Sequence, residues 1–266
     1  MRVIVIANNV IKRNRVLVYH KVDNKFELGL TRVTPSQFNR QIYHLISHGY
    51  KLVTLTDLFF RCSDDPSAIA ITFDDGYEDI FDYAFPILQK YNMPATIFLI
   101  SSYIGKLNEW DANLGWIHFK HLDKEEITEL IQAGWEIGSH GVNHKNLKGL
   151  SKREIESEIG ESKKYLENQF NTKVSFYASP FGKINLNILE IALNKGYKGV
   201  CGFYSFKRYR TTLQIFEIPR LAVYSTDSIK SIDRKLSTGL RLKIEIFKQS
   251  ITNFCSNATI LVNSLR

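Results

Sequence analysis

The sequence predicts an α/β protein whose strands run parallel. Strand-like segments alternate with helix-like segments along most of the chain, which is the pattern of a parallel α/β sheet. The length of 266 residues lies within the range of an α/β barrel, and hydrophobic residues make up 44% of the chain. No internal repeat or low-complexity linker interrupts the pattern, so we expect a single domain. In this interpretation residues 1–230 form the α/β unit, and residues 231–266 form a basic C-terminal extension packed on it.

The first half of the chain begins with an expected strand at residues 15–20. A helix follows, with Thr34 as its N-cap, Pro35 at its first position and Gly49 at its end. Residues 68–73 are continuously apolar, which is typical of a strand buried on both faces. The next expected elements are a helix and then a strand, at residues 77–90 and 95–100.

Two capping boxes mark helices in the second half, Asp123 with Glu126 and Ser151 with Glu154. Strands are expected before and after the second of these helices, at residues 135–140 and 174–179. A further helix is expected at residues 185–197 and a further strand at residues 198–203. The segment at residues 240–247 alternates at period two like a half-exposed strand, yet it also suits a basic helix. The sequence leaves that alternative open.

The chain carries a formal charge of +8 and a pI near 9.2. Such an excess fits an anionic partner such as phospholipid head groups or an acidic glycan. No helix-turn-helix, zinc-finger or RNA-binding signature accompanies the charge, so we expect no nucleic-acid partner, while peripheral contact with a membrane stays open. Cys62, Cys201 and Cys255 are far apart in the sequence and form no metal-binding pair, which favours reduced thiols.

The N-terminal segment holds a short apolar run that Asn8 and Asn9 interrupt, and no small-residue cleavage site follows it. We interpret it as a first strand rather than an export signal. No run of about eighteen apolar residues occurs, so no transmembrane helix is expected. We therefore expect the protein in the cytoplasm or on the inner face of the membrane.

Two adjacent carboxylates, Asp74 and Asp75, follow the apolar strand at residues 68–73. Like charges repel, so such a doublet is a poor choice for stability alone. A helix N-terminus would explain one of the two acids, but not both. A division of labour explains both: one aspartate binds a metal ion, and the other remains free as a base.

His140 and His144 follow another expected strand, and a polar cluster at residues 179–183 follows a third. Because the carboxyl ends of parallel strands meet at one rim, we expect these groups beside the two acids. Two imidazoles and one carboxylate form a ligand set for Zn²⁺ or another divalent transition metal. His44 and His48 repeat the spacing on the polar face of an expected helix without acids nearby, and we interpret them as surface residues.

The motifs TFDDGY, SHGVNH and SPFG, in this order, resemble the first three motifs of the polysaccharide deacetylases. This is the fourth carbohydrate esterase family, also called the NodB-homology domain. The resemblance covers residues 15–224, with a mild departure at Gly141, where serine or threonine is usual. It implies a distorted (β/α)7-type barrel and the removal of N-acetyl groups from an amino-sugar glycan or a glycan precursor.

The resemblance also implies roles for the acids and the histidines. Asp75, His140 and His144 correspond to the metal ligands, and Asp74 corresponds to the general base. The implied cofactor is one divalent metal ion, zinc in the first place, with iron, cobalt or nickel as alternatives.

Two departures from the family pattern concern the groups around the base. The third motif usually carries an arginine where this chain has Ala178, and the branch that deacetylates poly-N-acetylglucosamine is similar in having alanine there. Arg220 is a candidate replacement.

The late leucine-x-histidine motif that supplies the general acid is missing after His144, but the same pattern occurs early and ends at His20. That branch resembles a circular permutation in which this strand comes first, although a purely structural role for His20 stays open.

The mechanism that we expect is hydrolysis by a metal-activated water. Asp74 accepts the proton of the water and His20 protonates the leaving amine. We expect the backbone N–H of Tyr77 to hold the oxyanion. Pro180 and Phe181 would shape one wall of the groove, and Trp116 would stack on a sugar ring. The alternatives are a catalytically weak glycan-binding relative, and a metal-dependent hydrolase of C–N bonds in another acylated or lipid-linked substrate.

Overall fold

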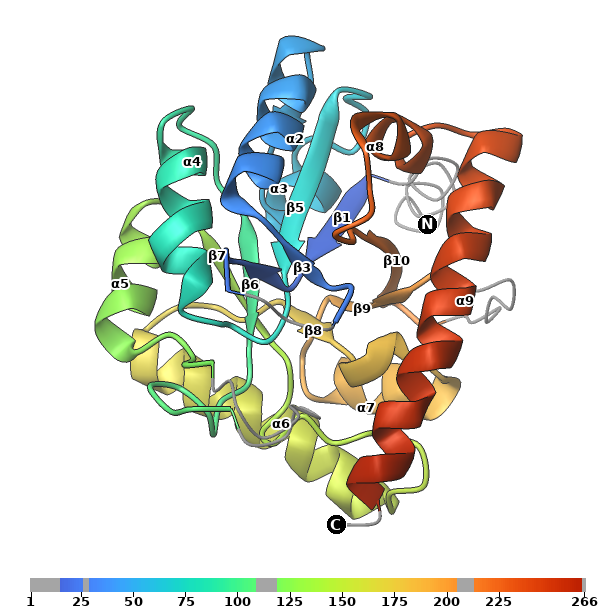
Figure 1. Cartoon of the computed structure of the whole chain (residues 1–266). Coiled ribbons are helices and arrows are strands. Elements are labelled where there is room, and N and C mark those ends of the chain that lie inside the picture. The colour runs from blue at the N-terminus through green and yellow to red at the C-terminus, as the bar shows by residue number, and fades with distance from the viewer. Residues whose placement is uncertain (1–14, 26–28, 109–118, 205–212, 265–266) are drawn as a thin grey trace.

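The computed structural model describes residues 15–25, 29–108, 119–204 and 213–264, with the backbone alone for residues 253–264. Seven parallel strands close into a barrel with helices around it (Figure 1). Around the ring the order is β1, β10, β9, β8, β7, β6 and β5, and β5 pairs again with β1. The strands are β1 (Val16–Tyr19), β5 (Ala68–Phe73), β6 (Thr96–Leu99), β7 (Glu136–Ser139), β8 (Phe176–Ala178), β9 (Gly199–Phe203) and β10 (Phe216–Ala222). This confirms the parallel α/β fold and the seven-stranded barrel.

The helices begin where the sequence places their caps. Thr34, Asp123 and Ser151 each accept a hydrogen bond from the backbone of the first helical turn, and the last two form complete capping boxes. The helices are α2 (Pro35–Ser47), α3 (Leu55–Phe60), α4 (Phe85–Gln89), α5 (Lys124–Gln132), α6 (Lys152–Phe170), α7 (Leu186–Asn194), α8 (Ile229–Lys235) and α9 (Gly239–Ser264). Short elements complete the fold: β2 (Lys21–Val22), β3 (Arg32–Val33), β4 (Lys51–Leu52), a π-helix (Ile80–Ala84) and a 3-10 turn (Pro180–Gly182).

Two expectations about helices need correction. The helix expected from residue 77 begins only at Ile80, because the preceding residues form the loop that follows β5. The segment at residues 240–247 is part of α9, so the strand alternative is wrong. Its period-two pattern arises because apolar side chains occupy both sides of one helix, a buried side and an exposed side. The strand expected within residues 1–14 lies outside the described residues.

Side chains alternate between the inside and the outside of the barrel. On β1, Tyr19 faces outward, where its ring meets that of Phe38 in α2 with centroids 5.1 Å apart. The other face of the strands encloses a buried cluster that includes Phe98 and Ile218. Arg220 follows Ile218 by two residues on β10, so its charged side chain also enters the barrel.

The C-terminal helix α9 packs against β10 and is hydrogen-bonded to its backbone. The side chain of Gln249 accepts a hydrogen bond from the N–H of Ala222 at 2.6 Å and donates one to the carbonyl of Arg220 at 3.1 Å. In the described part of the chain, no helix combines the length and the apolar character that a bilayer-spanning segment needs. Cys62 and Cys201 are free thiols, while the side chain of Cys255 lies outside the described part.

Candidate active site

Four predicted site residues meet where the barrel strands end. Asp74 and Asp75 follow β5, and His140 follows β7. Nε2 of His140 lies 3.3 Å from Oδ1 of Asp75, and Nε2 of His144 lies 3.4 Å from the same oxygen. The ligand atoms of these three side chains lie within 4.8 Å of one another, and all three residues are buried. The fold thus brings together the acid and the two histidines that the spacing singled out.

The second histidine pair forms no such cluster. Nε2 of His44 lies 2.7 Å from Oδ1 of Asp233 in α8, and His48 is exposed. The surface assignment therefore holds for His48, while α8 partly covers His44. Among the described residues, Asp75, His140 and His144 form the one group of acidic, histidine or cysteine side chains that could hold a metal ion.

The donor atoms of this group fit a divalent transition metal. Nδ1 of His140 lies 2.8 Å from the carbonyl of Ala178, which only accepts, so Nδ1 carries the proton and Nε2 presents a lone pair. Burial lowers the pKa of His144 to about 3, so this imidazole is neutral at neutral pH. Oδ1 of Asp75 is buried and accepts no hydrogen bond from any described residue. Three electron-pair donors therefore face one point, where a cation would satisfy them.

The two aspartates stay ionised despite their burial. Burial disfavours the charge of Asp75, but the imidazoles of His140 and His144 beside it outweigh this effect and keep its pKa below the usual value. Burial also lowers the pKa of His140, yet the nearby Asp74 and Asp75 raise it overall. A proton and a metal ion therefore compete for Nε2 of His140, which makes metal affinity depend on pH.

Arg220 reaches from β10 and holds both carboxylate oxygens of Asp74. Its Nη1 donates to Oδ1 at 2.7 Å and its Nη2 donates to Oδ2 at 2.8 Å. Both side chains are buried. Burial opposes ionisation of Asp74, but the charges of Arg220 and His140 outweigh it and keep the pKa of Asp74 below the usual value. The paired contact fixes the orientation of the carboxylate, and the assignment of Arg220 as replacement for the arginine absent at Ala178 stays a prediction.

His20 lies beside Asp74 because β1 is inserted between β10 and β5. In that pairing Tyr19 lies opposite Phe73, and the N–H of Asp74 donates to the carbonyl of Tyr19 at 3.0 Å. His20 is half-buried, and its Nδ1 has no hydrogen-bond partner among the described residues. A structural histidine would be expected to bond a neighbouring carbonyl through this atom. Its position fits the candidate acid, and the catalytic role stays a prediction.

The backbone is left-handed at several site residues. The φ angles of Asp75, His144 and Phe181 are +70°, +55° and +59°, values that side chains with a Cβ rarely adopt. At Gly76, with φ +69°, an added Cβ would lie 2.7 Å from Cδ2 of Leu99, so both conformation and space require glycine. Such uncommon backbone conformations gather at functional sites, where the surrounding structure holds them in place.

The remaining predicted substrate residues occupy different environments. The ring of Phe181 lies 5.0 Å from that of His144 between centroids, and Pro180 is buried directly before it. The side chain of Tyr77 is buried, and its hydroxyl accepts a hydrogen bond from Asn108 at 3.2 Å. The assignment of the Tyr77 backbone N–H to an oxyanion stays a prediction. Trp116 lies outside the described residues.

Comparison with known proteins decides the family. Residues 62–200, just over half of the chain, match the family described as polysaccharide deacetylase. The chain belongs to the polysaccharide deacetylase family. It is 34% identical to "Putative polysaccharide deacetylase YxkH" of Bacillus subtilis over 69% of this chain and 62% of the relative. It is 30% identical to the poly-beta-1,6-N-acetyl-D-glucosamine N-deacetylase of Staphylococcus aureus, over 62% of this chain and 59% of that protein. The matches thus span about three fifths of these curated relatives.

Several solved structures share the fold. The Streptococcus pyogenes deacetylase PplD, in complex with acetate, superposes with a TM-score of 0.70 at 24% identity, covering 85% of this chain and 98% of that one. IcaB from Ammonifex degensii superposes with a TM-score of 0.61 at 22% identity, covering 71% of this chain and 83% of that one. At these identities the likeness supports the barrel fold alone.

Two residues without a predicted role support the candidate site from outside the ligand cluster. His121 is buried, and its Nδ1 lies 2.9 Å from the carbonyl of Asp75, to which it must donate. Glu158 of α6 accepts hydrogen bonds from the N–H groups of Val142 and Asn143 at 3.0 Å and 2.9 Å, and from the Asn143 side chain at 2.8 Å. An acid on the apolar side of an amphipathic helix was a visible signal for Glu158. His121 offered no comparable signal in the sequence.

Glu158→Gln should weaken metal binding about 10- to 100-fold, which is the usual cost of losing a group that orients metal ligands. Both carboxylate oxygens of Glu158 accept hydrogen bonds, so a glutamine must turn an NH₂ group toward an N–H donor of the loop that carries His144. Titration of the metal-free protein with Zn²⁺ measures the effect. Glu161→Gln, on the exposed side of the same helix, is the matched control. Equal affinities for the two variants would contradict this role.

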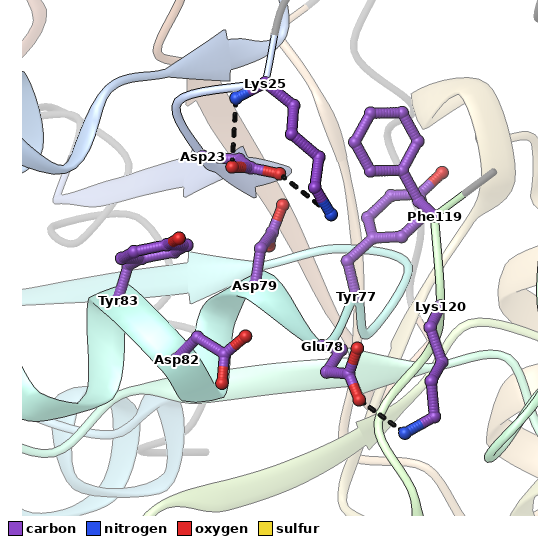
Figure 2. A pocket seen from close by; sticks show the side chains of 9 residues that line it. All are labelled: Asp23, Lys25, Tyr77, Glu78, Asp79, Asp82, Tyr83, Phe119 and Lys120. Carbon is purple, nitrogen blue, oxygen red and sulfur yellow. Dashed lines mark hydrogen bonds and ion pairs between the residues drawn. The ribbon is translucent and has the colours of Figure 1, made fainter. Parts of the chain in front are cut away.

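A small pocket borders the loop after Asp75. Figure 2 shows acidic side chains around it, with Lys25 paired to Asp23 and Lys120 paired to Glu78. Its volume is about 50 Å³, which suits one or two water molecules and is too small for a sugar ring. We therefore assign no sugar subsite to it. Its lining residues are Asp23, Lys25, Tyr77, Glu78, Asp79, Asp82, Tyr83, Phe119 and Lys120.

Proposed function

We propose that the protein is a metal-dependent deacetylase that removes N-acetyl groups from an amino-sugar glycan or a glycan precursor. The observation that carries the proposal is the convergence of Asp75, His140 and His144 beside a separate aspartate, Asp74, that Arg220 holds in place. Membership of the polysaccharide deacetylase family supports the same activity.

The side chains divide the chemistry between them. Asp75, His140 and His144 would hold the metal ion, which when bound polarises the acetyl carbonyl and acidifies a water molecule. Asp74 accepts the proton of the attacking water, with Arg220 keeping its carboxylate ionised and oriented. His20, which directly follows the neighbouring strand β1, donates a proton to the leaving amine. The N–H of Tyr77 holds the developing oxyanion.

The alternative of a glycan-binding relative without activity depended on Ala178. Arg220, which lies on another strand, contacts Asp74 in a chain that lacks the arginine at Ala178, and this contact favours an active enzyme over a binding protein. The substrate stays a proposal, with polymers, lipid-linked sugars and nucleotide-linked sugars as candidates. The expected location, in the cytoplasm or on the inner face of the membrane, also stays a prediction.

The test measures metal content and acetate release together. The purified protein should contain one divalent metal ion, and a chelator should abolish acetate release from N-acetylglucosamine oligomers until Zn²⁺ is restored. A panel of β-1,6-linked and β-1,4-linked oligomers, lipid-linked sugars and nucleotide sugars would identify the substrate class. Metal-loaded protein that releases no acetate from any of these compounds would overturn the proposal.

A further inference from the structure

Helix α9 carries apolar side chains on two opposite sides. Leu242 and Ile246 are buried against the barrel, together with the polar Glu245 and Gln249. The other side is open to solvent and carries what we call the α9 stripe, with exposed fractions of 75%, 46%, 60% and 52% for Leu240, Ile244, Phe247 and Ile251. The spacing of four, three and four residues places these side chains in one line along the helix, about 16 Å long.

The outward orientation of the stripe is fixed by polar contacts on the inner side of α9. Glu245 accepts hydrogen bonds from Arg234 at 2.6 Å and from the fully buried Lys235 at 3.0 Å. One turn later, Gln249 bonds the backbone of β10. Rotating α9 to bury the stripe would leave these buried groups without partners, which costs more than the exposed apolar surface does. Figure 1 shows α9 at the edge of the molecule, outside the other helices.

Basic side chains flank the stripe on both sides. At 100° per residue, Arg241 and Lys248 lie on one side of the line and Lys243 lies on the other. Arg241 and Lys243 are exposed. The side chain of Lys248 is 40% exposed, and its Nζ pairs with the buried Asp227 at 3.2 Å and the buried Glu245 at 3.4 Å, so the two exposed residues carry most of the outward charge. Glu245 is the single acid in the sequence of α9, and its side chain is fully buried. The outer surface of α9 between residues 240 and 251 is therefore apolar along its centre and positive along its margins.

We propose that the α9 stripe docks on an anionic phospholipid surface, with the helix lying in the plane of the interface. An apolar line between basic margins is the arrangement that inserts shallowly into a bilayer while cations meet the lipid phosphates. The charge favours this occupant over a second copy of the chain, because a symmetric contact through the stripe would bring together Arg241 and Lys243 of both copies. The net charge of +8 acts in the same direction.

Co-sedimentation of the full chain with vesicles tests this proposal. Wild-type protein should pellet with phosphatidylglycerol vesicles at low salt, and binding should fall with added salt and on pure phosphatidylcholine. Phe247→Ser with Ile251→Ser should weaken binding at least tenfold. Arg241→Gln with Lys243→Gln should weaken it about 25-fold, as about fivefold for each charge removed. Tyr165→Ser, which removes an exposed aromatic side chain on α6, is the matched control and should bind like the wild type.

The outcomes separate this surface from the catalytic proposal. Acetate release from a soluble oligomer and the thermal midpoint should stay unchanged in the stripe variant, because its residues face solvent and lie outside the site. Absence of binding to phosphatidylglycerol vesicles at low salt would overturn the proposal, as would equal binding by the stripe variant. A wild-type dimer in sedimentation equilibrium that the stripe variant converts to a monomer, without vesicle binding, would assign the stripe to a second copy instead.

Discussion

Asp74→Asn should reduce acetate release at least about a hundredfold while the metal content stays near that of the wild type. The carboxylate of Asp74 is buried beside the three candidate ligands but belongs to none of their contacts; both of its oxygens face Arg220 instead. An asparagine keeps the shape and can still accept a hydrogen bond from Arg220, but it cannot take a proton from water. The loss should therefore appear in kcat with little change in KM.

Two further variants complete this test. His140→Ala should remove both metal and activity, because it deletes a ligand atom of the cluster. Asp64→Asn changes an exposed aspartate before β5 and should leave both quantities unchanged. If Asp74→Asn kept more than about a tenth of the activity, the assignment of the base would be wrong.

Arg220→Met should lower both activity and stability. The substitution leaves the charge of Asp74 buried without its partner, which typically costs about 3–5 kcal/mol of unfolding free energy. Loss of the arginine charge also raises the pKa of Asp74, so the acid side of the pH–activity profile should move to higher pH. Denaturant unfolding and kcat measured across pH check the two effects.

A double-mutant cycle separates the ion pair from general packing. Asp74→Asn with Arg220→Met removes both charges, so the double variant should be less destabilised than the sum of the single variants. Arg220→Lys keeps the charge but loses the paired hydrogen bonds, and it should fall between wild type and Arg220→Met in activity. Additive destabilisation in the cycle would show that Arg220 acts through packing and not through Asp74.

Arg220 reaches Asp74 from a strand other than the one that carries Ala178. Ala178 is buried on β8, and the guanidinium that contacts Asp74 comes from β10. Gln249 of α9 bonds the backbone of Arg220, so the C-terminal helix supports the same strand. Asp74 is thus held by β10, which α9 supports in turn, and both segments are distant from Asp74 in the sequence.

Local signals in the sequence predicted much of the fold. The helix caps at Thr34, Asp123 and Ser151 depend on side chains within three residues of the backbone they bind, so the sequence locates them directly. The continuous apolar run of β5 marked a buried parallel strand for a similar reason. Strand β10 was not identified, because Pro219 cannot donate to a ladder and normally argues against a barrel strand.

The sequence by itself determined the chemistry available to this protein: two adjacent acids, two histidines four residues apart, and strand ends that place them on one rim. Only the tertiary structure decided which groups meet them. The contact between Arg220 and Asp74 joins residues 146 positions apart, and the contacts of His121 and Glu158 likewise depend on neighbouring elements. The tertiary structure also decided which side of α9 faces solvent. Periodicity shows that a helix has two apolar sides, but the buried polar contacts of the fold select the one that faces the barrel.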